Sequence, residues 1–414
     1  MKYGIMIYKE TENIGDDIQS YAAKQFLPHL DYFLEREELD LFHPENDETV
    51  SVIMNGWYMY NKFNWPVSDF VHPLYIAMHF SQEPQFNNYE IGSEYLEGIG
   101  SEKLRQDGPV GCRDKATEEL LRSKGIPCYF SGCLTLTLPK KFESETTEPY
   151  VCLVNVSDEV VSHYQSMYPD LDIRKISQEP MVVPNSPWEE REKNVEELLG
   201  IYQNATCVIT KRLHCALPCL ALETPVLLLS DGQIEESRFE GLYDLLHVTD
   251  TKQLLSGEFA YDLLHPLKNK DNYVTIREEL IKKCREFVEM SEKLPDRDEE
   301  RIERYYSQWE ERAKFKQKII GNQYRNITSH ALEVIDYQKE LKAWSDELTK
   351  GNEWLKNQND NQSAYIRKLE EQKTELTEKI ASLESELQLE KEKLQKAKES
   401  YIVRKIIQKK HLEG

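Results

Sequence analysis

The stretch with the clearest chemical content is Cys207–Leu229, CVITKRLHCALPCLALETPVLLL. Its pattern predicts a strand, a polar turn, a helix and a second strand. The turn carries Lys211, Arg212 and His214. Two cations can hold an anionic ligand, and an imidazole can accept and return a proton near neutral pH. Two surface cations beside a histidine packed in the core would give the same pattern. This stretch alone therefore does not distinguish a ligand-binding turn from a structural one, and other segments are needed.

A parallel α/β sheet would bring such residues together, because the turns after its strands meet at the carboxyl edge, where ligands bind. The chain opens with one such unit: an apolar strand over Tyr3–Tyr8, a turn, and a helical pattern from Ile18. The turn contains Asn13, Gly15 and Asp16. Glycine permits an unusual backbone there, and an aspartate can cap the helix. We keep these three residues as candidates for a ligand-facing turn, although capping alone would explain them.

A second unit places Arg113 at the end of the strand in VGCRDKAT. Asp114 can cap the helix that follows. The Arg113 guanidinium can grip a carboxylate or a phosphate through two hydrogen bonds, or it can pair with a nearby surface carboxylate.

Two further candidates follow apolar strands in the same half of the chain. Trp57 comes after Val50–Met54 and is followed by more aromatic residues, which offer flat faces for a sugar ring or fold onto their own domain. His79 lies in the strand-like Tyr75–Phe80. We take Trp57 and His79 as possible acceptor-site or cleft residues.

The composition limits the class of protein. The chain has 414 residues, 39% of them hydrophobic, which is enough for two ordinary cores. No run of about 18 apolar residues occurs, and the N-terminus lacks the pattern of a secretory signal, so we expect a cytoplasmic protein. The net charge is −22. Because nucleic-acid binding needs clustered cations, we expect no nucleic-acid partner.

A charged linker, KKFESETTEP at residues 140–149, separates two successive strand–helix patterns. The chain is therefore predicted to be an α/β protein with two Rossmann-like domains facing a cleft, a GT-B-like arrangement, followed by a C-terminal helical coiled coil. The predicted divisions are an N-terminal domain on the acceptor side (1–145), a second domain on the donor side (146–290), a charged helical segment (291–330) and the coiled coil (331–410).

The coiled coil is predicted from a heptad pattern near the C-terminus. One position holds Ile366, Lys373, Ile380, Leu387, Leu394 and Tyr401, and the other holds Leu369, Leu376, Leu383, Glu390 and Ala397. Burial of this seam implies a homo-oligomer or a partner helix, whereas a single charged helix folding back on its own body is the alternative. The basic end of the chain, residues 404–410, could make a peripheral contact with an anionic membrane, which would place the protein at its inner face.

Three motifs occur in order: NIGDD, then VGCRDKAT with SGCLTLTL, then VITKRLHCALPCLALETPVLLL. Together they resemble the polysaccharide pyruvyl transferase family over roughly residues 1–250. The resemblance implies a metal-independent GT-B-type enzyme that moves a pyruvyl group from phosphoenolpyruvate onto a sugar of a cell-surface polysaccharide, as a ketal. It also implies that His214 is the general acid or base. Two features depart from the family pattern: Cys215 replaces a glycine of many relatives, and SGCLTLTL replaces an Asp-Pro version.

The resemblance further implies that Arg113 and Arg212 hold the donor, and neighbouring Lys211 is a candidate for the same task. We therefore expect phosphoenolpyruvate and a glycan acceptor as substrates, with no metal and no other cofactor. Two alternatives stay open from the residues. A basic cleft would also suit a nucleotide-sugar glycosyltransferase, and a catalytically silent scaffold could use the coiled coil to gather other assembly enzymes.

Overall fold

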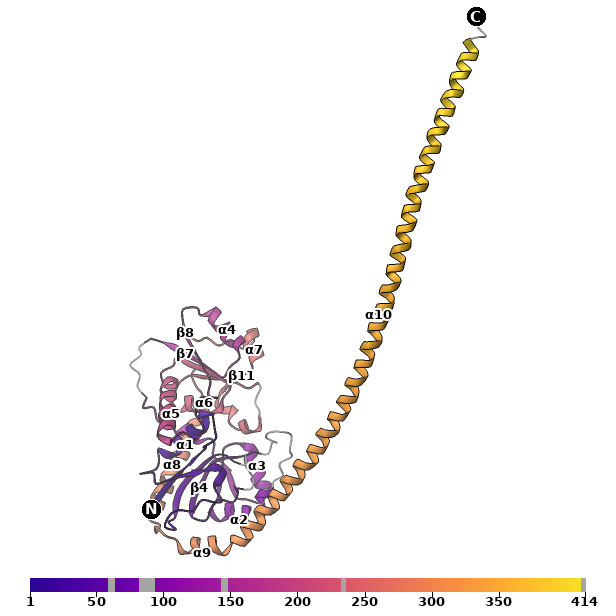
Figure 1. The fold of residues 1–414 in the computed structure, drawn as a ribbon. Coiled ribbons are helices and arrows are strands. Elements are labelled where there is room, and N and C mark those ends of the chain that lie inside the picture. Colours follow the sequence, from indigo (N-terminus) through magenta and orange to yellow (C-terminus); the bar gives the residue numbers. More distant parts are fainter. Residues whose placement is uncertain (59–63, 82–93, 143–147, 232–235, 411–414) are drawn as a thin grey trace. The chain divides into compact units, whose positions relative to one another are not determined.

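The computed structural model describes residues 1–58, 64–81, 94–142, 148–231 and 236–410 (Figure 1). The chain divides into two compact units, Met1–Thr328 and Ser329–Gly414. The first unit contains two parallel sheets with their helices, and the second belongs to one long helix. The predicted combination of α/β sheets with a C-terminal helical region is therefore confirmed.

The first sheet has six parallel strands in the order β2-β1-β3-β4-β5-β6. Its central strand β3 is buried at almost every position, as expected for a parallel sheet covered on both faces. The strands are β1 (Lys2–Ile7), β2 (Tyr32–Glu35), β3 (Val50–Tyr58), β4 (Val71–Phe80), β5 (Val110–Cys112) and β6 (Cys128–Phe130).

Short polar turns start the helices of this sheet. The side chain of Asn13 accepts a hydrogen bond from Gly15 N at the start of α1, and Asp114 accepts one from Thr117 N at the start of α3. The helices are α1 (Ile14–Lys24), α2 (Gly98–Asp107), α3 (Lys115–Ser123) and the 3₁₀ turns η1 (Arg36–Glu38), η3 (Glu94–Leu96) and η4 (Leu134–Thr137).

The second sheet has five parallel strands in the order β11-β10-β9-β7-β8. The strands are β7 (Tyr150–Val154), β8 (Asp172–Ile176), β9 (Cys207–Thr210), β10 (Val226–Leu229) and β11 (His247–Thr249). The helices are α4 (Asp158–Met167), α5 (Trp188–Gln203), α6 (Leu213–Ala221), α7 (Thr251–Ser256) and the 3₁₀ turns η5 (Glu236–Phe239) and η6 (Tyr243–Leu245). Strand order reverses beside β1 in the first sheet and beside β7 in the second, which is where open α/β sheets bind ligands.

A buried arginine joins the two sheets. Arg191 on α5 donates hydrogen bonds to the carbonyl oxygens of Tyr8, at 2.8 Å, and Thr11, at 3.2 Å, in the segment between β1 and α1. Its Nε lies 3.3 Å from a carboxylate oxygen of Asp17 on α1. Burial raises the pKa of Asp17 to about 7, although Arg191 acts in the opposite direction. The two sheets therefore share polar contacts as well as a continuous apolar core.

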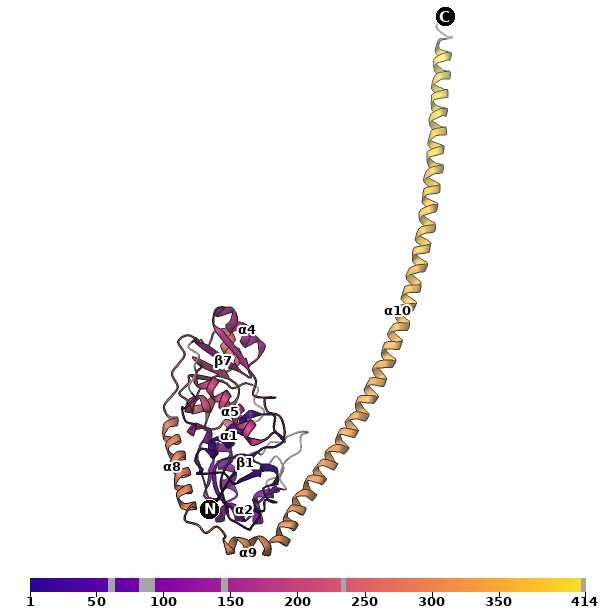
Figure 2. The ribbon, with the colours of Figure 1, turned by 60° about the vertical axis from the view of Figure 1, so that its left-hand side comes forward.

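Helix α8 (Tyr273–Ser291) returns to the first sheet after the second is complete (Figure 2). It contacts β3, β4 and η4, and Phe287 stacks on His72 of β4 at 5.1 Å between ring centroids. At its other end α8 contacts α6 beside the second sheet, where Arg277 Nη1 donates to Ala221 O at 3.1 Å. The buried residues Leu280, Cys284 and Phe287 form one face of α8, and an apolar face of this kind can pack on either sheet.

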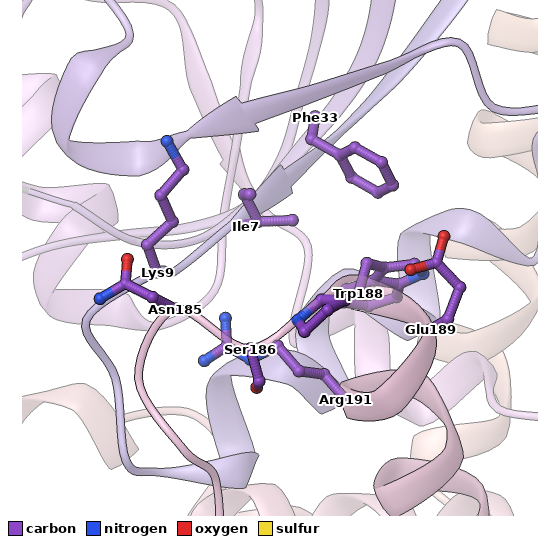
Figure 3. Close-up of a pocket in the computed structure, with 9 residues that line it drawn as sticks. Ile7, Lys9, Phe33, Asn185, Ser186, Trp188, Glu189 and Arg191 are labelled. Carbon is purple, nitrogen blue, oxygen red and sulfur yellow. The ribbon is translucent and has the colours of Figure 1, made fainter.

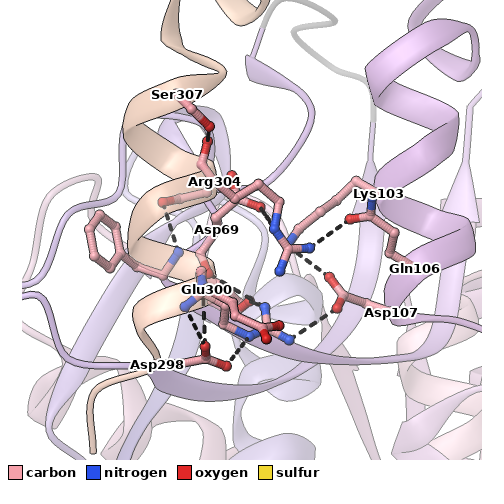
Figure 4. Close-up of polar contacts among 12 residues, drawn as sticks. Asp69, Lys103, Gln106, Asp107, Asp298, Glu300, Arg304 and Ser307 are labelled. Atoms are coloured by element: carbon pink, nitrogen blue, oxygen red, sulfur yellow. Dashed lines mark hydrogen bonds and ion pairs between the residues drawn. The ribbon is translucent and has the colours of Figure 1, made fainter.

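The segment after α8 is held to the first sheet by a network of charges (Figure 4). Asp69, which is fully buried, accepts a hydrogen bond from Lys103 Nζ at 3.1 Å and pairs with Arg312. Arg304 Nε lies 3.9 Å from the same carboxylate. The elements that supply these arginines are α9 (Glu299–Ser307) and the first turns of α10 (Trp309–Lys410).

The second unit, taken by itself, is the helical continuation of α10. Its large apolar side chains are exposed along the described length, among them Leu348, Leu369 and Leu383. None of the helices in the described part of the chain is both long enough and apolar enough to span a membrane.

Candidate active site

A small pocket collects residues from the carboxyl ends of strands in both sheets. It encloses about 40 Å³ and is open to solvent on one side. Each of its residues follows a strand: Asn13 follows β1, Arg113 follows β5, Gln178 follows β8, and Arg238 follows β10. The turn after β9 supplies the other three, Arg212, Leu213 and His214. Four of the residues chosen from sequence, Asn13, Arg113, Arg212 and His214, therefore line one pocket.

Pro218 explains why His214 departs from helical geometry. His214 has φ −82° and ψ 23°, values sparsely populated in helices, within the first turn of α6. In a regular helix its carbonyl would accept a hydrogen bond from the amide of residue 218, and proline has no amide hydrogen. The side chain of Gln178 donates to this carbonyl instead, with Nε2 3.0 Å from the His214 oxygen. Gln178 therefore fixes the backbone that carries the imidazole.

The His214 ring is held in its neutral form. Burial lowers its pKa well below the usual value, and the neighbouring charges of Arg113, Arg238 and Arg212 lower the pKa further. Its Nε2 is buried and has no hydrogen-bond partner among the described residues. A neutral imidazole nitrogen can accept a proton, and a bound anion would raise its pKa by screening the three arginines.

Arg113 reaches the pocket from a buried position. Only 2% of its surface is exposed, and its backbone amide donates to Met78 O at 2.8 Å. Arg113 Nε lies 3.5 Å from Asp114 Oδ2, and the same oxygen lies 2.6 Å from His79 Nδ1. The neighbouring charges of His79 and Arg113 hold the pKa of Asp114 below its usual value despite burial. Asp114 thus links His79 to Arg113, and His79 lies outside the pocket lining.

Arg212 and Arg238 bring further positive charge to the pocket. Arg212 is half-buried and donates to Glu179 Oε2 at 2.9 Å. Arg238 lies in η5 after β10 and was not among the predicted site residues. Arg113 was chosen because it follows a strand, and the same reasoning applies to Arg238. Gln178, by contrast, gave no sequence signal, because its role depends on a carbonyl 36 residues away.

The turn after β1 lies directly against the histidine. Asn13 Oδ1 accepts from Gly15 N at 3.0 Å, and Asn13 lines the pocket. A Cβ at Gly15 would lie 3.2 Å from His214 Cβ and 3.4 Å from its Nδ1. Asp16 does not line the pocket: it accepts from Thr11 Oγ1 at 2.7 Å, and burial raises its pKa.

Two other sequence candidates make contacts elsewhere. Lys211 pairs with Asp231 at 2.7 Å, although it adjoins Arg212 in the sequence. The guanidinium of Arg36 lies 5.7 Å from the Trp57 ring, and Arg36 Nη1 donates to the Trp57 carbonyl at 3.1 Å. Neither Lys211 nor Trp57 lines the pocket.

A second, larger pocket of about 480 Å³ lies beside the same segment that follows β1 (Figure 3). Ile7 and Lys9 line it from β1 and the turn, and Trp188 and Arg191 line it from α5. Phe33, which is 44% exposed, lies 6.4 Å from Trp188 between ring centroids. The pocket therefore combines an exposed aromatic face with polar groups.

The chemistry of the first pocket suits an anion. Its side chains supply three guanidinium groups, which are donors to carboxylate or phosphate oxygens, together with the amide of Asn13 and an imidazole. In the described part of the chain, no three histidine, cysteine, aspartate or glutamate side chains are grouped as metal ligands would be.

Comparison with known proteins places this site in a family. No curated protein matches the chain. A solved structure described as a co-structure of S. aureus MnaA with UDP is similar at 12% identity and a TM-score of 0.31, over 69% of this chain and 91% of that one. The family model described as polysaccharide pyruvyl transferase matches residues 13–232, which include Asn13, Arg113 and the turn carrying Arg212 and His214. The sequence resemblance is confirmed, and the chain belongs to the polysaccharide pyruvyl transferase family.

Proposed function

We propose that the protein transfers the pyruvyl group of phosphoenolpyruvate to two hydroxyl groups of a sugar in a polysaccharide or its precursor, forming a ketal. Family membership supports pyruvyl transfer in general. The observation that carries the specific proposal is the convergence of Arg113, Arg212, Arg238 and His214 on one pocket. We place this reaction in the cytoplasm, with no metal and no cofactor beyond the donor itself.

The arginines bind the donor in this proposal. Phosphoenolpyruvate carries a carboxylate and a phosphate on adjacent positions, and each matches the planar fork of a guanidinium. The enclosed volume of about 40 Å³ has room for one anionic group of the donor. The rest of the donor molecule would then lie toward the opening of the pocket. The first 330 residues carry a strong net negative charge, which repels an anionic donor. The local group of arginines makes this pocket the place where such a donor is attracted.

The reaction then needs two proton transfers. The methylene carbon of the donor gains a proton, and the oxygen of the first sugar hydroxyl bonds to the central carbon as it loses its own. The oxygen of the second hydroxyl bonds to the same carbon, and phosphate leaves with the proton of that hydroxyl. His214 accepts the hydroxyl proton as a neutral base and returns a proton as an acid, since donor binding raises its pKa.

The larger pocket beside β1 is our proposed acceptor site. Phe33 offers an aromatic face, and Lys9, Asn185 and Glu189 offer polar partners for hydroxyl groups. Both pockets adjoin the segment from Ile7 to Asn13, so one turn would contact both substrates. Phe33→Ala is then expected to raise the KM for the acceptor while leaving phosphoenolpyruvate affinity unchanged. Equal acceptor KM values would remove this pocket from the proposal.

Calorimetric titration with phosphoenolpyruvate tests the donor directly, with UDP as the competing ligand. Arg113→Lys keeps the charge but loses the two-point geometry, and it should weaken phosphoenolpyruvate binding by about 10- to 100-fold, as expected for one charged hydrogen bond. Arg285→Ala, at an exposed position of α8, is the matched control and should bind like wild type.

Two outcomes would favour the alternatives. Binding of UDP without phosphoenolpyruvate would support a nucleotide-sugar glycosyltransferase that uses the same cations. Binding of neither ligand by folded protein would support a silent scaffold, whose assembly would depend on the C-terminal helix alone.

A further inference from the structure

The C-terminal part of α10 exposes an apolar seam. Its aliphatic members are between 46% and 62% exposed: Ile366, Leu369, Leu376, Ile380, Leu383, Leu387 and Leu394. They recur at two positions of a heptad, so they form one stripe along the helix. A stripe of this kind is stable in water when another helix covers it. The seam also has two charged members, Lys373 and Glu390. Their charges restrict the orientation and register of the helix that covers the seam.

A parallel pair of identical chains would place like charges together. In register, each seam residue meets its own copy, so Lys373 would face Lys373 and Glu390 would face Glu390 of the second chain. Beside the seam, Lys393 would face Lys398, whereas the pairs Lys379 with Glu384 and Glu386 with Lys391 would be favourable. The flanking positions alone therefore do not exclude a parallel pair, and the two charged seam positions distinguish the orientations. Like charges in a partly buried seam are unfavourable, so the parallel arrangement carries a cost at both polar positions.

An antiparallel pair removes these clashes. Aligning Lys373 with Glu390 of the second chain fixes the register, because the residue numbers of the two members of every seam layer must then have the same sum. The remaining layers become apolar: Leu369 with Leu394, Leu376 with Leu387, and Ile380 with Leu383. A shift by one heptad would instead place Lys373 opposite Leu383 or Ala397.

The flanking positions agree with the same register. Lys379 then lies opposite Glu386 of the second chain, and Glu370 lies opposite Lys391. Each contact occurs twice by symmetry. Glu390 is already paired with Lys393 of its own helix at 2.8 Å, in an exposed contact that an approaching Lys373 can share.

We propose that α10 pairs with α10 of a second copy of this chain in antiparallel orientation, centred between Ala381 and Ser382. The occupant of the exposed seam is thus another molecule of the same protein, and charge matching selects both orientation and register. This proposal is independent of the activity proposed above.

Engineered cysteines in the full-length protein test the orientation. The eight native cysteines all precede residue 285 and seven are buried, so a Cys128→Ser background removes the half-buried one. Chains with Leu376→Cys and Leu387→Cys, carrying different tags, are expressed alone or together and then oxidised. We expect a cross-linked dimer only from co-expression. Cross-linking of either chain alone with itself, or no cross-link in any sample, would overturn the proposal.

A charge reversal gives a second, independent readout by sedimentation equilibrium. Lys373→Glu should raise the dimer dissociation constant at least about tenfold, because two acids then face each other in the seam. The double change Lys373→Glu with Glu390→Lys should restore it. Lys368→Glu, on the outer face of the helix, is the matched control. An unchanged constant in Lys373→Glu would contradict the antiparallel register, since a parallel pair merely exchanges one like-charge contact for another.

Discussion

Gly15 in the first turn of α1 and His214 in the first turn of α6, helices that follow strands of different sheets, lie close together: a Cβ added to Gly15 would be 3.2 Å from His214 Cβ. It would also lie 3.0 Å from Asn13 Oδ1. The absence of a side chain at residue 15 therefore lets the first turn of α1 support the imidazole. Gly15 has a helical backbone, not the unusual conformation that glycine permits. A glycine is therefore needed at this position because there is no room for a side chain.

Gly15→Ala is expected to lower kcat by about tenfold or more, because sub-ångström misplacement of a catalytic group is costly. Thermal stability should stay close to wild type, since alanine is a better helix former than glycine. Gly200→Ala on α5 is the control, where the nearest atom to an added Cβ is 3.7 Å away. Steady-state kinetics of the two variants give the comparison. Equal kcat values would show that the contact does not position His214.

His214→Ala is expected to lower turnover by about two to four orders of magnitude while much of the donor affinity remains. The reason is that the imidazole transfers protons, whereas the arginines hold the donor. Single-turnover transfer from labelled phosphoenolpyruvate measures the first quantity, and calorimetry measures the second. His265→Ala removes an exposed histidine and should change neither. Wild-type turnover in His214→Ala would remove this residue from the mechanism.

The acid limb of the pH profile should depend on Arg238. This arginine is one of the charges that lower the pKa of His214. A base with a lowered pKa stays neutral, and so active, to lower pH, and its activity falls as pH drops through that pKa. Arg238→Leu removes one positive charge, raises the pKa of His214 and should move the acid limb of kcat/KM to higher pH. The control Arg285→Leu should leave the acid limb of kcat/KM unchanged. An unchanged acid limb in Arg238→Leu would show that His214 is not the base.

The charge network under α9 and α10 should matter for stability rather than catalysis. Asp69 pairs with Lys103 and Arg312 in a buried setting, so Asp69→Asn leaves these cations without their shared carboxylate. Loss of one partner of a buried pair costs about 3–5 kcal/mol of unfolding free energy. Urea unfolding would measure this loss, with exposed Asp346→Asn as the control. A change within about 0.5 kcal/mol would assign the network no net stabilisation.

Sequence patterns predicted a strand, a turn, a helix and a second strand in Cys207–Leu229, and the structure forms β9, α6 and β10 there in that order. They also singled out four residues of the pocket, because strand ends in a parallel sheet share one edge. The patterns were silent on Gln178, whose side chain replaces the hydrogen bond that Pro218 cannot donate. Lys211 shows the same limit: adjacent to Arg212 in sequence, it pairs with Asp231 instead. The direction of a side chain after a strand depends on hydrogen-bond and ion-pair partners that are distant in the sequence, and the spacing of apolar residues does not reveal them.

The return of α8 to the first sheet has a consequence for synthesis of the protein. The amide of Thr49 donates to Asp296 O, and Arg301 donates to Val71 O, so the first sheet is completed by residues that follow the second sheet in the chain. The strands that leave the ribosome first therefore wait longest for their covering helix. The part of the first sheet that α8 covers therefore stays without this cover until the whole second sheet has been synthesised.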